Sequence, residues 1–242
     1  MIETLTYAPT AFAELVRSVN VDGTKNVLDV ARECGVRRLV HTSSIITVPD
    51  DHPRGAQEGP SYSSAPDLYS STKVESERLV LAANGKMGLR TTAIRPGGIY
   101  GPGERNTFIG PIVSSLKQGA PLILFGNGRT RMDYTYIDNL VDAQLRAAER
   151  LVEGSPVCGQ AYFVTDGDPI NTGMFSRTLV DDMGITARAV RIPGPVARAL
   201  APAGDRDFQI FGKPKPLVRV VDVQLGVQDR FFSLERARRD LD

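Results

Sequence analysis

The middle of the chain reads as a strand, a helix and a second strand, and this order limits the fold more than any other feature. Leu39–Thr42 is predicted as a short buried strand, Tyr69–Ala83 as a helix, and Leu89–Ile94 as another strand. Strands joined through a helix pair in parallel. We therefore expect an α/β fold built on a parallel sheet.

The flanking segments continue the alternation. Phe12–Cys34 is predicted as a helix with a possible break near Asn20, and Gly35 can end it. A loop rich in proline, glycine and serine is expected over Pro49–Asp67. The later elements expected are helices at Thr107–Lys117 and Asp138–Arg150, and strands at Leu122–Phe125, Ala161–Thr165 and Ala187–Ile192.

Composition excludes several classes of protein. The 242 residues carry a formal net charge of +1 without a basic block, so no nucleic-acid partner is expected. The two cysteines lie far apart in the sequence, which favours a reducing, cytoplasmic location. Because the two histidines have no close spacing to each other or to a cysteine, we expect no metal site. No signal peptide and no membrane span are expected.

Tyr69 and Lys73 stand four positions apart at the predicted start of a helix, one turn apart on the same face. An ammonium beside a phenol favours the phenolate and lowers the pKa of such a tyrosine from its ordinary value of about 10. A tyrosine of this kind can exchange a proton with a substrate hydroxyl. Alone, this spacing arises readily by chance, so its surroundings must decide.

Two neighbouring segments favour an active site. The first strand runs into Thr42-Ser43-Ser44, and hydroxyls at the carboxyl end of a strand are where open α/β sheets place ligand-binding groups. The second strand ends in the Gly/Pro run 95–103, which permits a close approach between backbone and ligand.

In this order the motifs resemble the extended short-chain dehydrogenase/reductase superfamily. They are Asn20-Val21-Asp22-Gly23-Thr24, Thr42-Ser43-Ser44, Tyr69-x-x-x-Lys73 and Arg95-Pro96-Gly97-Gly98-Ile99-Tyr100-Gly101-Pro102. Segments 136–143 and 161–171 look most like the 3-beta-hydroxysteroid dehydrogenase branch, which includes sterol-4-alpha-carboxylate dehydrogenases. The resemblance covers most of the chain, and it implies a Rossmann-like parallel sheet.

The resemblance assigns catalytic roles to four residues. Tyr69 would be the acid/base, Lys73 would hold the nicotinamide ribose and activate Tyr69, Ser44 would donate to the substrate oxygen, and Asn20 would support a proton-relay water. For Asn20, an alternative as the cap of a helix beginning at Val21 stays open. For Ser44, a turn hydrogen bond is the alternative.

The cofactor implied is NAD or NADP. By the same resemblance, Lys73 and Tyr69 would contact it, together with Thr42, Ser43, Pro96 and Ile99. Pro96 and Ile99 correspond to positions that line the nicotinamide, and a plain loop is the alternative.

The glycine-rich turn that opens a dinucleotide-binding fold is missing from the sequence. Gly101-Pro102-Gly103 and Gly126-Asn127-Gly128 lack a third glycine at the right offset. We expect an N-terminally incomplete sheet with an exposed strand edge, and weak or absent cofactor affinity. Residues 1–103 would be the rest of the dinucleotide-binding domain. Residues 104–242 would form mainly a smaller α/β substrate lobe, with a strand near 161–165 returning to the sheet.

Met132 helps to choose the substrate class. Nucleotide-sugar epimerases and dehydratases usually carry an arginine at this position to clamp the substrate pyrophosphate, whereas here Arg131 stands one residue earlier. One step along a strand turns a side chain to the other face. We therefore expect an apolar secondary alcohol, such as a sterol, as substrate. The alternatives are a nucleotide-sugar epimerase or dehydratase, and a non-catalytic fragment that binds no dinucleotide. A homodimer is a further expectation from the superfamily.

Overall fold

Three parallel strands form the centre of the fold. The computed structural model describes residues 10–49, 54–59, 61–64, 68–104, 109–201, 223 and 226–242. The central sheet contains β1 (Arg38–Thr42), β2 (Arg90–Pro96) and β7 (Ala161–Val164), in the order β1-β2-β7. Thr42 pairs with Ile94 of β2, and Ile94 pairs with Tyr162 of β7. The predicted parallel α/β sheet is confirmed.

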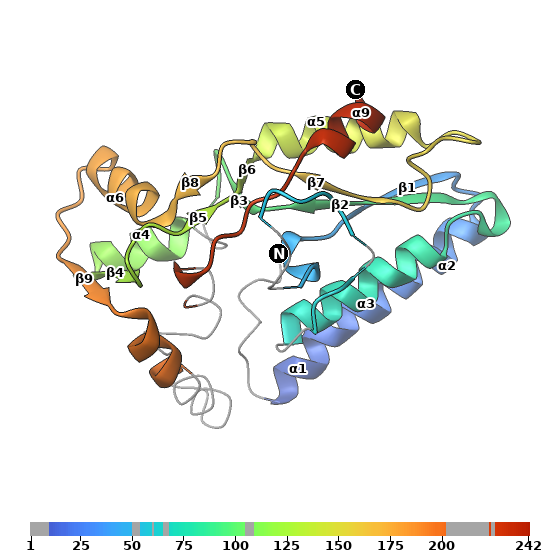
Figure 1. The fold of residues 1–242 in the computed structure, drawn as a ribbon. Coiled ribbons are helices and arrows are strands. Elements are labelled where there is room, and N and C mark those ends of the chain that lie inside the picture. The colour runs from blue at the N-terminus through green and yellow to red at the C-terminus, as the bar shows by residue number, and fades with distance from the viewer. Residues whose placement is uncertain are drawn as a thin grey trace.

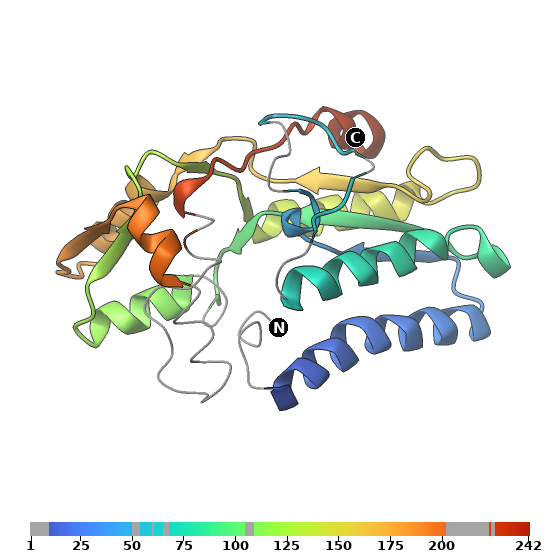
Figure 2. The same ribbon diagram turned by 60° about the horizontal axis from the view of Figure 1, so that its bottom comes forward.

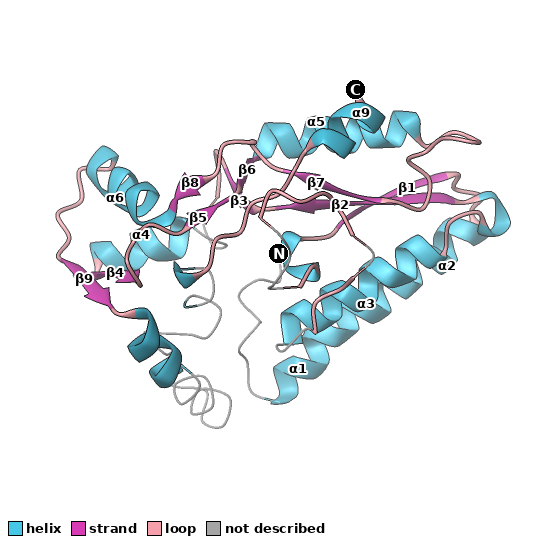
Figure 3. Cartoon of the chain, viewed as in Figure 1, coloured by secondary structure: helices cyan, strands magenta, loops and turns pink. Residues whose placement is uncertain are grey.

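Helices cover both faces of this sheet. Figure 1 and Figure 3 show α5 (Ile137–Arg150) and the C-terminal α9 (Glu235–Leu241) on one side. On the other side lie α1 (Thr10–Arg17), α2 (Gly23–Glu33) and α3 (Leu68–Ala82). In Figure 2 the first helical segment runs alongside α3, which agrees with the contacts of α1 and α2 with α3. The result is a three-layer sandwich.

Each layer interface has its own apolar core. Leu140, Ala143 and Ala147 of α5 pack on Ile94 and Tyr162. On the opposite face, the core joins α2 and α3 to the segment that enters β2, and its buried members are Leu28, Ala31, Val80, Ala83 and Leu89. A third cluster, with Phe163 and Phe232 stacked at a centroid distance of 4.1 Å, packs beside the segment after β1. The helix α3 is thereby fixed against the sheet.

The helix is not interrupted near Asn20, so the predicted break at this position is wrong. The chain stays helical there and widens into a π-helical turn, η2 (Ser18–Asp22), between α1 and α2. A π-turn inserts an extra residue without ending the helix, and such turns are frequent at functional sites. Gly35, with φ of +68°, follows the helix in the left-handed conformation expected at such an end.

The second group of elements lies beside the sheet. β4 (Leu122–Phe125) and β9 (Ala189–Ile192) pair in parallel, and α4 (Ile109–Lys117) and α6 (Thr172–Asp182) pack near them around Leu116, Leu122 and Val180. Four short strands were not predicted: β3 (Gly98–Tyr100), β5 (Arg131–Met132), β6 (Tyr134–Tyr136) and β8 (Ile170–Asn171). β3 pairs with β6 in parallel, and β8 pairs antiparallel with β5. Shorter helical turns are η3 (Ile45–Thr47) and η4 (Lys86–Gly88), and residues 194–201 are helical.

One side of β1 pairs with no other described strand, so β1 forms an edge of the sheet. Its residues are exposed or half-buried, so the prediction that Leu39–Thr42 is a buried strand is wrong, because an edge strand is covered on one side only. β2, in the middle of the sheet, is buried along almost its whole length. The expected exposed strand edge is therefore present in the described part of the chain. Among the described helices, none is long and apolar enough to cross a membrane. The predicted loop at Pro49–Asp67 is described only in part, and His52 lies outside the described residues.

Candidate active site

Tyr69 and Lys73 lie in the first turns of α3, half-buried and one turn apart. The Nζ of Lys73 donates to the carbonyl oxygen of Thr42 at 3.0 Å. Thr42 is the last residue of β1, so this bond fixes the ammonium at the carboxyl end of the sheet. The structure therefore brings the predicted helix motif and the predicted strand end together.

Asn20 reaches the same helix from the π-turn. Its Nδ2 donates to Oγ1 of Thr72 at 3.0 Å, and its carbonyl oxygen accepts from Oγ of Ser76 at 2.7 Å. The alternative in which Asn20 caps a following helix is wrong, because the residue before α2 is Asp22, it is itself helical, and no side chain caps there. The physical reason is that η2 leaves the helix continuous. Asn20 instead joins η2 to α3 beside Lys73.

The two serines after β1 differ in accessibility. The backbone N–H of Ser43 donates to the carbonyl of Ile94 at 2.7 Å, and its hydroxyl donates to the carboxylate of Glu77. Ser43 is only 3% exposed. Ser44 is half-buried, and its Oγ accepts from the N–H of Ile46 at 3.3 Å at the start of η3. Ser44 thus has the more accessible hydroxyl, although it makes the turn bond considered as its alternative role.

Thr42 connects to both layers of helices. Its carbonyl oxygen accepts from Lys73, and its Oγ1 accepts from Nε2 of Gln144 on α5 at 2.7 Å. The Thr42 side chain therefore points toward α5, on the face of the sheet opposite α3. A cofactor contact of this side chain would compete with the bond to Gln144.

The turn after β2 approaches its neighbours closely. Pro96 ends β2, and Ile99 lies in β3, where it is half-buried. A Cβ on Gly97 would lie 2.4 Å from the carbonyl oxygen of Asp133, and the N–H of Gly97 donates to Oγ1 of Thr135 at 2.8 Å. Only glycine fits such an approach. The turn is therefore set by its packing on Asp133 and β6.

A buried ion pair lies behind these residues, and the sequence reasoning missed it. Nε of Arg95 donates to Oε2 of Glu77 at 2.9 Å, and the second guanidinium nitrogen of the fork donates to Oε1 at 2.5 Å. The two side chains are 3% and 0% exposed. Burial by itself would raise the pKa of Glu77, but Arg95, with help from Ser43 and Tyr62, holds that pKa below its ordinary value. The sequence does contain one sign of this role, because Glu77 stands one helical turn beyond Lys73 and so shares a helix face with it.

Tyr62 covers this ion pair from the loop. Burial and the charge of Glu77 raise the pKa of Tyr62 to about 12. The guanidinium carbon of Arg78 lies 4.5 Å from the centre of its ring, and that of Arg95 lies 5.6 Å from the same centre. Aromatic faces attract guanidinium groups. Burial and the charge of Glu77 therefore keep the phenol neutral at neutral pH, with both guanidinium groups near its ring.

His41 lies in β1, as predicted for a strand residue. Burial, together with the charge of Lys73, lowers the pKa of His41 to about 4. Its Nε2 is buried and has no hydrogen-bond partner among the described residues. The imidazole is therefore neutral at neutral pH. Within the described part of the chain, no three His, Cys, Asp or Glu side chains gather in a way that could hold a metal ion.

Met132 and Arg131 point to different surroundings, as the alternation of a strand requires. Met132 is 4% exposed, and its Cε lies 3.3 Å from the position of a Cβ on Gly98. Arg131 forms a 3.7 Å ion pair with Asp229, and its guanidinium lies over the ring of Phe231. The apolar side chain of Met132 thus faces the turn after β2, while the guanidinium of Arg131 is paired with Asp229.

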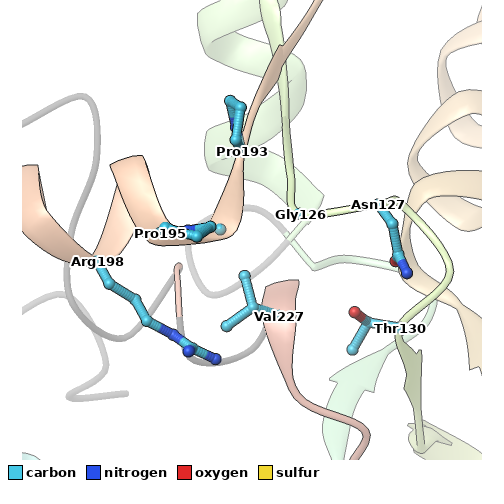
Figure 4. A pocket seen from close by; sticks show the side chains of 8 residues that line it. Gly126, Asn127, Thr130, Pro193, Pro195, Arg198 and Val227 are labelled. Atoms are coloured by element: carbon cyan, nitrogen blue, oxygen red, sulfur yellow. The ribbon is translucent and has the colours of Figure 1, made fainter.

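A separate cavity of about 400 Å³ lies at the ends of β4 and β9 (Figure 4). It combines proline and valine surfaces with one guanidinium. None of the predicted catalytic residues lines it. Its walls are formed by Gly126, Asn127, Thr130, Pro193, Gly194, Pro195, Arg198 and Val227.

Comparison with known sequences identifies one family. Residues 7–193 match the sequence model of the 3-beta hydroxysteroid dehydrogenase/isomerase family. A 3 beta-hydroxysteroid dehydrogenase/Delta 5-->4-isomerase of Mycobacterium tuberculosis is 38% identical over 226 residues, which are 93% of this chain and 61% of that protein. A 3beta-hydroxysteroid-dehydrogenase/decarboxylase of Arabidopsis thaliana is 34% identical, over 93% of this chain and 53% of its own length. The chain thus spans about three fifths or less of the length of these two relatives.

Solved structures share the fold. MoeE5, whose structure was determined in complex with UDP-glucose and NAD, superposes with a TM-score of 0.65 at 21% identity. The superposition covers 92% of this chain and 64% of MoeE5. At this identity the likeness concerns the arrangement of the Rossmann-like sheet and its helices.

Proposed function

Because the chain belongs to the 3-beta hydroxysteroid dehydrogenase/isomerase family, we propose that it carries the proton-transfer site of an NAD(P)-dependent 3-beta-hydroxysteroid dehydrogenase. The reaction is the oxidation of a secondary alcohol on an apolar, sterol-like ring. The observation that carries the proposal is the position of Lys73, fixed to the end of β1 one helical turn from Tyr69.

In this proposal Tyr69 takes the proton of the substrate hydroxyl. The neighbouring ammonium of Lys73 favours the phenolate and would hold the ribose hydroxyls of the cofactor. Ser44 donates to the substrate oxygen, and Asn20 supports a proton path past Thr72. Pro96 and Ile99 would line the nicotinamide. The bound cofactor would supply the acceptor for the hydride that leaves the carbinol carbon.

The residues present fit the reactive end of a nicotinamide cofactor. The Lys73 ammonium is held at the carboxyl edge of a parallel sheet, where open α/β folds bind ligands. The turn at Gly97 keeps backbone close to that edge. The substrate would be apolar, because the buried Met132 faces the turn and Arg131 is paired with Asp229.

A spectrophotometric assay tests this proposal. The purified chain is mixed with NAD or NADP and a 3-beta-hydroxysteroid, and reduced cofactor is followed at its absorbance band. We expect Tyr69→Phe to lower kcat by roughly 10²–10⁴-fold, the range of acid–base contributions. Tyr162→Phe is the matched control, because its hydroxyl bonds to Asp240 away from the site. Equal kcat for wild type and Tyr69→Phe would contradict the role of Tyr69.

The same assay separates the alternatives. Turnover of UDP-sugars and not of steroids would favour an epimerase or dehydratase, the class represented by several structures of similar fold. A titration with NADH, followed by nicotinamide fluorescence, measures cofactor affinity directly. If neither cofactor binds saturably and no substrate is turned over, the chain is a non-catalytic fragment.

We further propose a division into two parts and a homodimer. Residues 1–103 would be the remaining part of the dinucleotide-binding domain with the proton-transfer site. Residues 104–242 would form mainly the substrate lobe, while β7 within them returns to the central sheet. Four apolar side chains, Leu15, Val19, Val27 and Val30, are exposed along the first helical segment and would bury surface in a dimer. Light scattering after size exclusion measures the mass. Both cysteines are unpaired, which supports the cytoplasm as location.

A further inference from the structure

We infer that Glu77 is a positioning residue: its buried carboxylate joins the helix of Tyr69 and Lys73 to the ends of β1 and β2. This inference rests on the proposed function and deepens it. Glu77 is assigned no contact with substrate or cofactor. It acts through the residues that it holds.

The position of Glu77 on the helix supports this role. Tyr69, Lys73 and Glu77 follow one another at intervals of one turn and so share one face of α3. Lys73 bonds to the carbonyl of Thr42, and Glu77 accepts from the hydroxyl of Ser43, the next residue. The same helix face is therefore attached twice to the end of β1, immediately before Ser44.

Glu77 is also attached to β2. Arg95 donates two parallel hydrogen bonds to Glu77, at 2.9 and 2.5 Å, and this planar fork fixes both distance and orientation. Arg95 directly precedes Pro96 and the Gly97 turn. Tyr62 adds a hydrogen bond from the loop before α3. One carboxylate thus contacts the end of β1, the end of β2 and the loop.

Stability alone does not account for this arrangement. Removing two charges from water costs about as much as their attraction returns, so apolar residues of similar volume often replace a buried pair without loss. The Nη1 of Arg95 is also buried without a hydrogen-bond partner among the described residues, which adds to that cost. Unlike an apolar pair, the hydrogen-bonded pair fixes the orientation of α3 relative to the end of β2.

Glu77→Gln is the first test, and Glu75→Gln is its matched control. Glu75 lies on the same helix and also forms a forked pair, with Arg17 at 2.7 and 2.8 Å, but its side chain is 38% exposed. Each variant is examined by amide hydrogen exchange and by steroid turnover. We expect Glu77→Gln to raise exchange at Ser43–Ile46 and at Gly97–Tyr100 by about tenfold or more, while the core of α5 and β7 stays protected.

Turnover supplies the second readout. We expect Glu77→Gln to lower kcat by about 10²-fold with KM for the steroid nearly unchanged, because misplaced catalytic groups slow the chemical step. Glu75→Gln should match wild type in both measurements. A uniform rise of exchange over the whole sheet with unchanged kcat would show a merely structural role and overturn the inference. So would a Glu77→Gln variant indistinguishable from Glu75→Gln.

If Glu77→Gln fails to fold, the double variant Glu77→Met/Arg95→Met replaces the pair by apolar chains. It should fold cooperatively while exchange at Ser43–Ile46 stays raised, and wild-type protection and kcat in this variant would refute positioning. If the wild type shows no turnover, the proposed function fails, but the exchange experiment still decides whether Glu77 holds these segments.

Discussion

Replacing Asp133 by asparagine should change how the stability of the fold depends on pH. Asp133 follows β5 and is 1% exposed. Its Oδ2 accepts from the N–H of Phe232 at 2.9 Å, and its Oδ1 is buried without a hydrogen-bond partner among the described residues. Burial raises the pKa of Asp133 to about 6, against an ordinary value of 3.8.

The direction in which stability changes with pH follows from the number of protons that the folded and unfolded chains bind. Between pH 3.8 and about 6 the folded chain retains a proton that the unfolded chain has lost, so stability falls as the pH rises through this window. A shift of this size corresponds to at most about 3 kcal/mol, from 1.36 kcal/mol per pKa unit. We expect the titration of Asp133 alone to remove about 1–2 kcal/mol between pH 4.5 and pH 8. The buried His41, whose pKa is lowered to about 4, contributes with the opposite sign over an overlapping range, so the effect of Asp133 is read from a comparison with a variant.

Urea unfolding followed by circular dichroism measures this effect, since the chain has no tryptophan. The difference between wild type and Asp133→Asn at each pH isolates the titration of this one group. The asparagine variant should gain on wild type by about 1–2 kcal/mol as the pH rises. Asp29→Asn, at an exposed ion pair, should change by less than about 0.5 kcal/mol throughout. A constant difference, or a wild type that gains on the variant with rising pH, would refute the reasoning.

Three further changes test the packing by thermal or urea unfolding. Gly97→Ala should cost about 1–3 kcal/mol or more, because its Cβ would lie 2.4 Å from the carbonyl oxygen of Asp133; unchanged stability would contradict the close approach. Gly23→Ala should stabilise by about 0.5–1 kcal/mol, because Gly23 is helical and its Cβ would lie 3.6 Å from the nearest atom; a loss would show hidden strain in the π-turn. Phe232→Ala should cost about 3–5 kcal/mol through loss of its stack on Phe163, and a loss below 1 kcal/mol would speak against that core.

The main elements could be predicted because their apolar runs and their turn residues agree. Strands β1, β2, β4, β7 and β9 and the helices α3 and α5 lie within one or two residues of the sequence expectation. The short strands β3, β5, β6 and β8 could not be predicted, since two or three residues carry no periodic signal. Their pairing depends on partners far along the chain, such as Ile99 beside Thr135.

The proposed site was predictable in part for a similar reason. Tyr69 and Lys73 are local neighbours, so helical spacing alone places them together. Glu77 has the same spacing, but a glutamate on a helix ordinarily faces solvent. Its burial depends on Arg95, eighteen positions away in sequence, which only the crossover from α3 to β2 brings near. Sequence spacing identifies the face of a helix, and the tertiary fold decides what that face meets.

Thr42 shows how the parts of the site depend on one another. Its carbonyl oxygen holds the Lys73 ammonium from α3, while its hydroxyl accepts from Gln144 of α5. The end of β1 is therefore tied to both helical layers, although β1 pairs with a described strand on one side only. An edge strand is ordinarily the part of a sheet most free to shift. Because hydrogen bonds from both faces of the sheet hold the end of β1, the backbone that leads into Ser43 and Ser44 is fixed in position. A proton-transfer site requires such fixed geometry between its phenol, its ammonium and its hydroxyl donor.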